Sequence, residues 1–256
     1  MVLLKHEIKQ TFKQTLYWSI GISFFLLICI ILYPQMQTQM EDVSNMFRNM
    51  GTFSQAFGLD QLSFGTFLGF YSVECGNILG IGGALFASIT AISTMSKEKK
   101  EFLYIHPLSK KTIALTKLVN VFIQIIILNT ICFSLSILTS FILHIEFSLR
   151  PFLLLHFSYL LLQLEISAIC FSLSLIFKKT TLGLGISIPL ILYFIHIFIN
   201  ISPDLEFLKY ITPFAYTNAP YIINHLSLDF SLIGFGFGYS ILSLMISINI
   251  YQKQDL

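Results

Sequence analysis

The chain has 256 residues, of which 55% are hydrophobic and 11% are charged, and its mean hydropathy is +0.79. Soluble domains carry roughly 25% charged residues, so this composition excludes an ordinary soluble globular protein. The net charge of +2 is too small for nucleic acid to be expected as a partner.

Six long apolar runs follow one another along the chain. Each is about 18 residues or longer, which is the length at which a helix crosses the hydrocarbon core of a bilayer. Backbone polar groups in lipid must be satisfied within their own segment, so these runs are expected to be helices. We therefore predict an all-α, polytopic membrane protein with one domain over residues 1–256. A basic amphipathic helix over residues 1–15 is expected at the inner membrane surface. The expected spans are 16–33, 66–95, 114–143, 152–177, 180–201 and 230–251.

The segments outside the spans carry further predictions. Residues 42–57 are expected to form an amphipathic helix on the outer surface. Residues 200–229 hold three prolines and many aromatic residues, and are expected to form short interfacial or re-entrant helices that cap the outer mouth. The second span is rich in glycine, and Gly234 and Gly238 form a G-x-x-x-G pair in the sixth. Small residues let helices approach closely in lipid, so both features predict close packing, within the chain in preference to a dimer seam.

Lysine and arginine are distributed unequally between the two sides of the predicted bundle. Only Arg48, Arg150 and Lys209 lie on one side. By the positive-inside rule, the opposite side, which includes both termini, is expected in the cytoplasm. Twelve cations lie there: Lys5, Lys9, Lys13, Lys97, Lys99, Lys100, Lys110, Lys111, Lys117, Lys178, Lys179 and Lys253.

The cysteines fall in four different predicted helices and have no C-x-x-C spacing. This pattern is typical of buried small apolar residues and does not favour a disulfide framework or a metal site. We therefore expect no metal on this chain. The four are Cys29, Cys75, Cys132 and Cys170.

The most specific stretch is the loop between the second and third spans. It carries an apolar patch of Phe102, Leu103 and Ile105 among charged residues. Pro107 disfavours helical geometry at the residue before it, and Ser109 is expected to cap a new helix. Such a basic helix–break–helix suits the docking of a soluble partner, although an ordinary solvated loop also satisfies the positive-inside rule. The candidate docking residues are Lys97, Glu98, Lys99, Lys100, Glu101, Phe102, Leu103, Tyr104, Ile105, His106, Pro107, Ser109 and Lys110.

Two short runs resemble motifs of a known family. Residues 101–110, Glu-Phe-Leu-Tyr-Ile-His-Pro-Leu-Ser-Lys, resemble the E-F-L-L-x-x-P-[IV]-S-R element of ABC-2-type transporter permeases. Residues 210–216, Tyr-Ile-Thr-Pro-Phe-Ala-Tyr, resemble the P-F-x-Y element that these permeases carry before their last span. The chain departs from the family at Lys99 and Lys100, where Gly-Thr is usual, and at Lys110, where the family has arginine.

The resemblance implies an exporter-like (type V) permease with six spans in the bacterial plasma membrane. It implies that residues 97–110 include a coupling helix seated in a separate ATP-binding subunit, two copies of which hold ATP and Mg. It also implies a second permease chain, identical or different. The chain itself contains no Gly-Lys pair and so no P-loop, and we expect it to bind no cofactor and to catalyse no reaction.

Polar groups within or near the expected spans are candidates for the path of a cargo. A charge at the bilayer centre costs about 2.5–3.5 kcal/mol, so such a group normally faces a partner or a watery cavity. These side chains therefore either line the path or bond to a neighbouring helix for packing. Pro213, Phe214 and Tyr216 are expected to form an outer gate. The path candidates are Glu74, Gln163, Glu165 and His196.

The family resemblance and the 26 phenylalanines favour export of a lipophilic or amphipathic cargo (peptide, toxin or drug) by alternating access. The nearest subgroup exports amphipathic peptides such as phenol-soluble modulins, which would link the chain to antimicrobial-peptide resistance. One alternative is an ion-coupled secondary transporter, in which Pro189 would break the fifth span. Another is an intramembrane glutamate-dependent protease, because three i, i+4 pairs resemble fragments of that signature. They are Glu146 with Arg150, Phe152 with His156, and His196 with Asn200.

Overall fold

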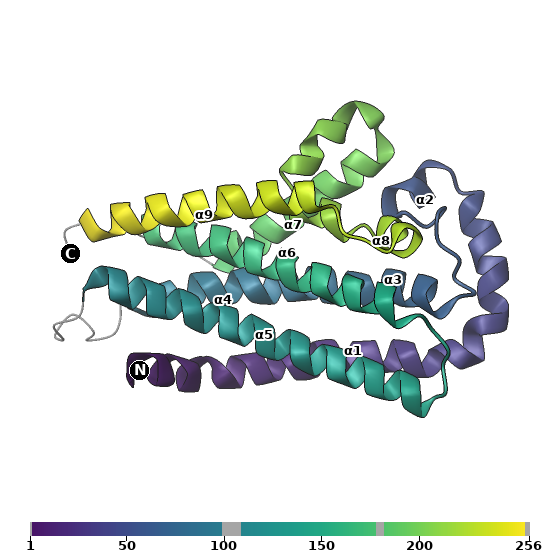
Figure 1. Cartoon of the computed structure of the whole chain (residues 1–256), viewed down its shortest axis with the longest axis horizontal. Coiled ribbons are helices and arrows are strands. Elements are labelled where there is room, and N and C mark those ends of the chain that lie inside the picture. Colours follow the sequence, from purple (N-terminus) through teal and green to yellow (C-terminus); the bar gives the residue numbers. More distant parts are fainter. Residues whose placement is uncertain (1, 99–108, 178–181, 254–256) are drawn as a thin grey trace.

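The computed structural model describes residues 2–98, 109–177 and 182–253 (Figure 1). Every regular element in these ranges is a helix, and six helices are long and apolar enough to cross a membrane. The prediction of an all-α fold with six spans is therefore confirmed. In chain order the elements are α1 (Val2–Arg48), α2 (Thr52–Phe57), α3 (Phe67–Asn77), the π-helix η1 (Ile78–Gly82), α4 (Gly83–Glu98), α5 (Lys110–Ile142), α6 (Leu149–Ile176), α7 (Leu182–Ile201), the 3-10 helices η3 (Pro203–Tyr210) and η4 (Pro213–Thr217), α8 (Ala219–His225) and α9 (Phe230–Lys253).

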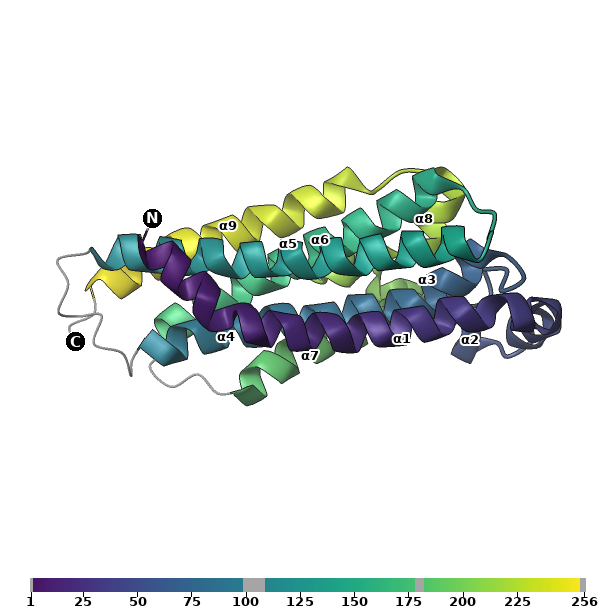
Figure 2. The ribbon, with the colours of Figure 1, turned by 90° about the horizontal axis from the view of Figure 1, so that it is seen from below.

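The long helices run side by side along the longest axis of the molecule (Figures 1 and 2). The start of α1, the end of α4, the start of α5 and the end of α9 lie at one end, which we call the lysine-rich end (Figure 1). The short helices α2 and α8 lie at the opposite end, which we call the hairpin end (Figure 1). Both termini therefore approach the same end of the bundle, as the charge distribution predicts.

Helix α1 is longer than the sequence suggested. It runs without interruption from Val2 to Arg48, so residues 2–15 do not form a separate helix. The helix expected over residues 42–57 is divided between the end of α1 and α2. Pro34 lies inside the helix, and Figure 1 shows α1 turning away from the bundle axis near the hairpin end. A proline inside a helix removes one backbone hydrogen bond and causes such a bend. The turned end is held by Ser44, whose hydroxyl accepts a hydrogen bond from the Phe64 backbone N–H at 2.8 Å.

The face of α1 that is buried near its start is polar. The apolar spacing predicts a face made of Leu4, Ile8, Phe12 and Thr15. Of these, Phe12 is exposed, Leu4 and Ile8 are half-buried and Thr15 is buried. Glu7 and Thr11 are buried with Thr15 against α5. These three residues are spaced by four, so they share one side of the helix. The apolar periodicity therefore predicted the buried face only in part, because α5 presents polar side chains of its own at this level.

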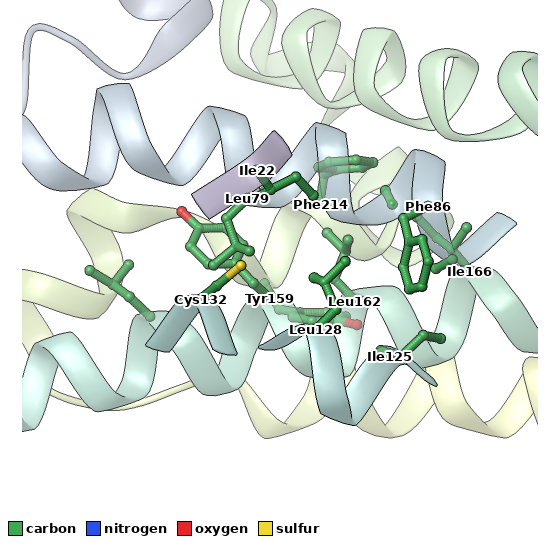
Figure 3. Close-up of a cluster of buried hydrophobic side chains, with 14 of the residues drawn as sticks. Ile22, Leu79, Phe86, Ile125, Leu128, Cys132, Tyr159, Leu162, Ile166 and Phe214 are labelled. Carbon is green, nitrogen blue, oxygen red and sulfur yellow. The ribbon is translucent and has the colours of Figure 1, made fainter. Parts of the chain in front are cut away.

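The hydrophobic core lies where α1, the η1–α4 region, α5, α6 and η4 meet. Figure 3 shows side chains from each of them in one cluster, including Ile22, Leu79, Leu128, Leu162 and Phe214. These five side chains are at most 5% exposed. Buried apolar packing in this region fixes the helices that surround the candidate sites.

Glycines in the second span make the close approach that was predicted. A Cβ on Gly76 would lie 2.4 Å from the Tyr159 hydroxyl, and one on Gly83 would lie 2.1 Å from Nε2 of Gln163. Both distances are far inside van der Waals contact, so α6 packs directly on the backbone of α3 and α4. The glycine-rich composition of this span is thus explained by packing against α6.

The glycine pair in the sixth span does not behave as predicted. A Cβ on Gly234 or Gly238 would meet no described atom within 4 Å, and both residues are exposed. The residue in close contact is Gly236, whose added Cβ would lie 2.4 Å from Oε2 of Glu165. The G-x-x-x-G pair therefore faces away from the rest of the chain, and the prediction of an intrachain contact there is wrong.

Helix α7 is the least buried of the six spans. In its most apolar stretch of 18 residues, only 11% are buried, against 67% in α6. Pro189 does not break it: the helix continues from Leu182 to Ile201. Proline has no N–H for the carbonyl of Gly185, four residues earlier, and the Ser88 hydroxyl of α4 donates a hydrogen bond to that carbonyl instead. One long face of α7, including Ile191 and Phe194, remains exposed.

Other predictions agree with the structure. The segment before the last span forms the short helices η3, η4 and α8, as expected from its prolines. The four cysteines are free. Cys75, Cys132 and Cys170 are buried and Cys29 is half-buried, which fits their interpretation as small apolar residues.

Candidate functional site

The described ends of the candidate docking segment, at the end of α4 and the start of α5, lie at the lysine-rich end. Lys97 and Glu98 are the last residues of α4. Ser109 caps α5 as predicted: its hydroxyl accepts a hydrogen bond from the Thr112 N–H at 3.2 Å, and Lys110 begins the helix. The other candidates lie outside the described residues: Lys99, Lys100, Glu101, Phe102, Leu103, Tyr104, Ile105, His106 and Pro107. Their role in docking stays a prediction.

A buried ion pair lies next to this segment. Nζ of Lys117 on α5 is 2.8 Å from Oε1 of Glu7 on α1, and both side chains are 1% exposed. The same Nζ donates to the carbonyl oxygen of Thr94, in the last turns of α4, at 3.4 Å. Lys117 thus contacts α1, α4 and α5 at once. The charge distribution places Lys117 on the cytoplasmic side, and nothing in it indicates that this side chain is buried and paired.

The ion pair is the first contact of a polar seam between α1 and α5. Asn120 donates a hydrogen bond to the Thr11 hydroxyl at 3.2 Å, and the Thr15 hydroxyl donates to Gln124. Gln124 in turn donates to Oδ1 of Asn120 at 3.1 Å. The sequence carried a signal for this seam, because Glu7, Thr11 and Thr15 recur every four residues, but apolar periodicity alone does not detect it.

Gln163, a path candidate, has a packing role in this conformation. Its side chain is fully buried. Oε1 of Gln163 accepts a hydrogen bond from Asn129 of α5 at 2.6 Å, and its amide donates to the carbonyl of Leu79 in η1 at 3.2 Å. It therefore ties α6 to α5 and to the π-helical turn of the second span.

Glu165, the second path candidate on α6, is also fully buried. The Tyr216 hydroxyl of η4 lies 2.9 Å from Oε2, and the Tyr239 hydroxyl of α9 is hydrogen-bonded to Oε1. The Tyr239 hydroxyl also lies 3.2 Å from the carbonyl oxygen of Ile211. The structure thus brings together Glu165 and Tyr216, which the sequence assigned to the path and to the outer gate separately.

The other residues predicted to form an outer gate are buried in the short helix η4. Pro213 and Phe214 are buried with Tyr216 in η4. The Thr212 hydroxyl donates a hydrogen bond to the Leu192 carbonyl of α7 at 2.8 Å, which connects η4 to that helix. Helix η4 is therefore fixed to α6 and α9 through Glu165 and to α7 through Thr212.

The last two path candidates lie apart from Glu165 and Gln163. Glu74 on α3 is exposed on the outside of the chain. His196 on α7 is half-buried and lies 3.4 Å from Nδ2 of Asn200, at the wall of a cavity of about 350 Å³ at the hairpin end. Tyr216 and Asp229 line the same cavity. Two of the four candidates are thus buried and bonded to neighbouring elements, and the other two are accessible.

A surface ion pair lies beside this cavity. Glu206 and Lys209 of η3 border the cavity at the hairpin end and form an ion pair of 2.6 Å. The hydrogen bond and charge of Lys209 lower the pKa of the Glu206 carboxyl, and the same contact raises the pKa of Lys209.

On another face, an apolar groove of about 670 Å³ runs between α1 and the η1–α4 region. Its lining includes Trp18, Phe25 and Ile81.

The residues of the protease-like pattern have separate environments. Glu146 is exposed in the connection between α5 and α6. Nε2 of the buried His156 lies 2.8 Å from the Tyr71 hydroxyl, and His196 lies at the outer cavity. Among the described residues, no three His, Cys, Asp or Glu side chains form a group that could hold a metal ion. His156 bonds to a neighbouring helix, as expected for a packing residue.

Comparison with known families identifies the bundle. The family model described as "ABC-2 family transporter protein" matches residues 1–256, the whole chain. The chain belongs to the ABC-2 transporter family. This ABC-2 protein is therefore a multi-pass membrane subunit of an ABC transporter, and members of its family generally work with an ATP-binding subunit. No curated protein and no solved structure shows significant similarity to the chain.

Proposed function

We propose that this ABC-2 protein is the permease of an ATP-driven exporter in the bacterial plasma membrane, with its lysine-rich end in the cytoplasm. The family match over the whole chain carries the proposal. The positive-inside rule supports the orientation, because both termini, the end of α4 and the start of α5 lie at the lysine-rich end (Figure 1). Alternating access would be driven by closure of two ATPase subunits, which supply ATP and Mg.

Residues 97–110 are the proposed docking element for the ATPase. They connect the end of α4 to the start of α5, where Ser109 caps the first turn. Lys117 then contacts α4 and α1 eight residues further along α5. A displacement of the docking element would therefore act on α1, α4 and α5, which Lys117 connects near the lysine-rich end.

A second permease chain, identical or different, is proposed to cover the exposed face formed by α7. Only 11% of the residues in the most apolar 18-residue stretch of this helix are buried within the chain. The cargo is proposed to be lipophilic or amphipathic, such as an antimicrobial or cytolytic peptide. Two accessible spaces support this class: the apolar groove beside α1, and the cavity at the hairpin end that Glu206 and Asp229 border.

Co-purification with the ATP-binding protein encoded beside this chain tests the proposal. The wild type is compared with Phe102→Asp/Leu103→Asp, and with Phe53→Asp/Phe57→Asp as a matched control. The control also replaces two apolar residues by aspartate, and Phe53 and Phe57 are exposed at the hairpin end. We expect the wild type and the control to retain the ATPase and the docking variant to lose it. Export by a chain that retains no ATPase under any nucleotide condition would instead support a secondary transporter.

A further inference from the structure

The carboxyl group of Glu165 is bonded to two elements other than its own helix. It is 0% exposed, and its two oxygens face different tyrosines: Oε2 faces Tyr216 of η4, and Oε1 faces Tyr239 of α9. The backbone of α9 presses on the same group at Gly236. The ion pairs of the described structure are Glu7–Lys117 and Glu206–Lys209, so no cation there neutralises Glu165.

The hydrogen bonds around Glu165 can be assigned by counting protons. The hydroxyl of Tyr239 has one proton, yet it lies within bonding distance of two acceptors, Oε1 of Glu165 and the carbonyl oxygen of Ile211. If Glu165 is ionised, Tyr239 donates to Oε1, and the carbonyl of Ile211, a residue that is 50% exposed, loses only this one donor. The cost then lies in a charge that stays buried without a counter-ion. If Glu165 is protonated, it donates to Tyr239, Tyr239 donates to Ile211, and Tyr216 donates to the second carboxyl oxygen. Every group then has a partner and no charge is buried.

This chain of bonds joins the parts that must separate for the outer mouth to open. Ile211 lies between η3 and η4, Tyr216 lies in η4, and Tyr239 lies on α9. Tyr216 also lines the cavity at the hairpin end. A movement of η4 away from the bundle would break its bond to Glu165 and widen this cavity.

We propose that Glu165, as a neutral carboxylic acid, is the positioning residue that holds η4 and the η3–η4 turn closed against α6 and α9. The inference rests on the proposed function, because it takes η3 and η4 to be the outer gate of a transporter. Its geometry is independent of the ATPase and of the cargo. It replaces the expectation that Glu165 contacts cargo along the path. The residue acts through Tyr216 and Tyr239, and it determines the position of η3 and η4.

The test measures how easily η4 moves away from α6 and α9. Thr217 at the end of η4 is 8% exposed and lines a narrow cleft at the hairpin end, so Thr217→Cys reports opening by its reaction with a membrane-impermeant maleimide. In this background we compare Glu165→Gln, Glu165→Leu, Tyr239→Phe and, as a control, Tyr210→Phe. Tyr210 is 43% exposed in η3, outside the bonded chain. Protein without the introduced cysteine gives the blank.

Gln can donate to Tyr239 and accept from Tyr216, as a neutral acid does, whereas Leu can do neither. We expect Glu165→Gln and Tyr210→Phe to label at the wild-type rate, Glu165→Leu to label at least tenfold faster, and Tyr239→Phe to fall between them. An infrared band of a protonated carboxyl group should be present in the wild type and lost in Glu165→Gln. Fast labelling of Glu165→Gln would overturn the neutral acid, and slow labelling of both Glu165→Leu and Tyr239→Phe would overturn the positioning role.

These outcomes are separable from failure of the proposed function. The labelling needs neither cargo nor ATPase, so loss of ATPase co-purification in the wild type would refute the transporter assignment and leave the labelling result intact. If Glu165→Leu does not fold, Tyr239→Phe removes a single hydroxyl from the same chain of bonds and decides the question alone.

Discussion

Replacement of Lys117 by methionine tests the buried ion pair at the lysine-rich end. The substitution keeps the length and most of the apolar volume of the side chain but removes its charge. Glu7, which is 1% exposed, would then lose the cation 2.8 Å away. Removal of one partner from a buried pair costs about 3–5 kcal/mol, because the remaining charge is buried without compensation. We expect Lys117→Met to lower the free energy of unfolding in mixed micelles by about this amount.

The double variant Glu7→Leu/Lys117→Met distinguishes the loss of a partner from the loss of packing. Apolar replacement of both members of a buried pair is often neutral, or stabilising by about 1–4 kcal/mol. We expect the double variant to be at least as stable as the wild type. Lys209→Met is the matched control, because its partner Glu206 is 67% exposed and the pair lies in solvent. It should leave stability nearly unchanged.

The comparison of single and double variants decides the interpretation. A Lys117→Met protein as stable as the Lys209→Met control would show that water reaches Glu7, and the buried pair would be refuted. A double variant as unstable as Lys117→Met would show that Lys117 acts through its apolar stem or its bond to the Thr94 carbonyl, at 3.4 Å, and not through Glu7.

Two further predictions use the glycines of α9 and the cap of α5. Gly236→Ala places a Cβ 2.4 Å from Oε2 of Glu165 and should destabilise the permease by about 1–3 kcal/mol through overpacking. Gly234→Ala, which meets no described atom within 4 Å, should be neutral or slightly stabilising; equal shifts in thermal unfolding would contradict the packing of α9 on α6. Ser109→Ala should cost about 1 kcal/mol and speed hydrogen exchange in the first turn of α5, because the Thr112 N–H loses its acceptor. Thr116→Ala removes an exposed hydroxyl of the same helix and should leave exchange there unchanged.

The number of spans was predictable because lipid leaves the backbone few choices. A helix must satisfy its own hydrogen bonds in hydrocarbon and must reach across about 30 Å, so length and apolarity are enough to locate it. The same reasoning does not apply beyond the membrane. Helix α1 continues past Pro34 because Ser44 and neighbouring residues find partners in the chain that follows, which no local pattern reveals.

The partners of the buried polar residues were not predictable for a related reason. The sequence indicates that Glu165 faces either a partner or a watery cavity, because a charge or an unsatisfied oxygen is costly within a span. The partners come from η4 and α9, about 50 and 70 residues further along the chain, and only the packing of these elements selects them. The same holds for Gln163, whose acceptor is a carbonyl of the π-helical turn.

Polar contacts also explain which faces of the permease are fixed. Apolar side chains gain little from meeting each other in lipid, so hydrogen bonds and close backbone contacts determine the register between helices. The contacts described above hold α1 to α5 at Glu7 and Thr15, and α6 to its neighbours at Gln163 and Glu165. The exposed side of α7 and the Gly234 side of α9 are among the surfaces on which the described structure places no such contact. A second permease chain would therefore meet faces that are still free to adjust, while the bonded interior keeps its register.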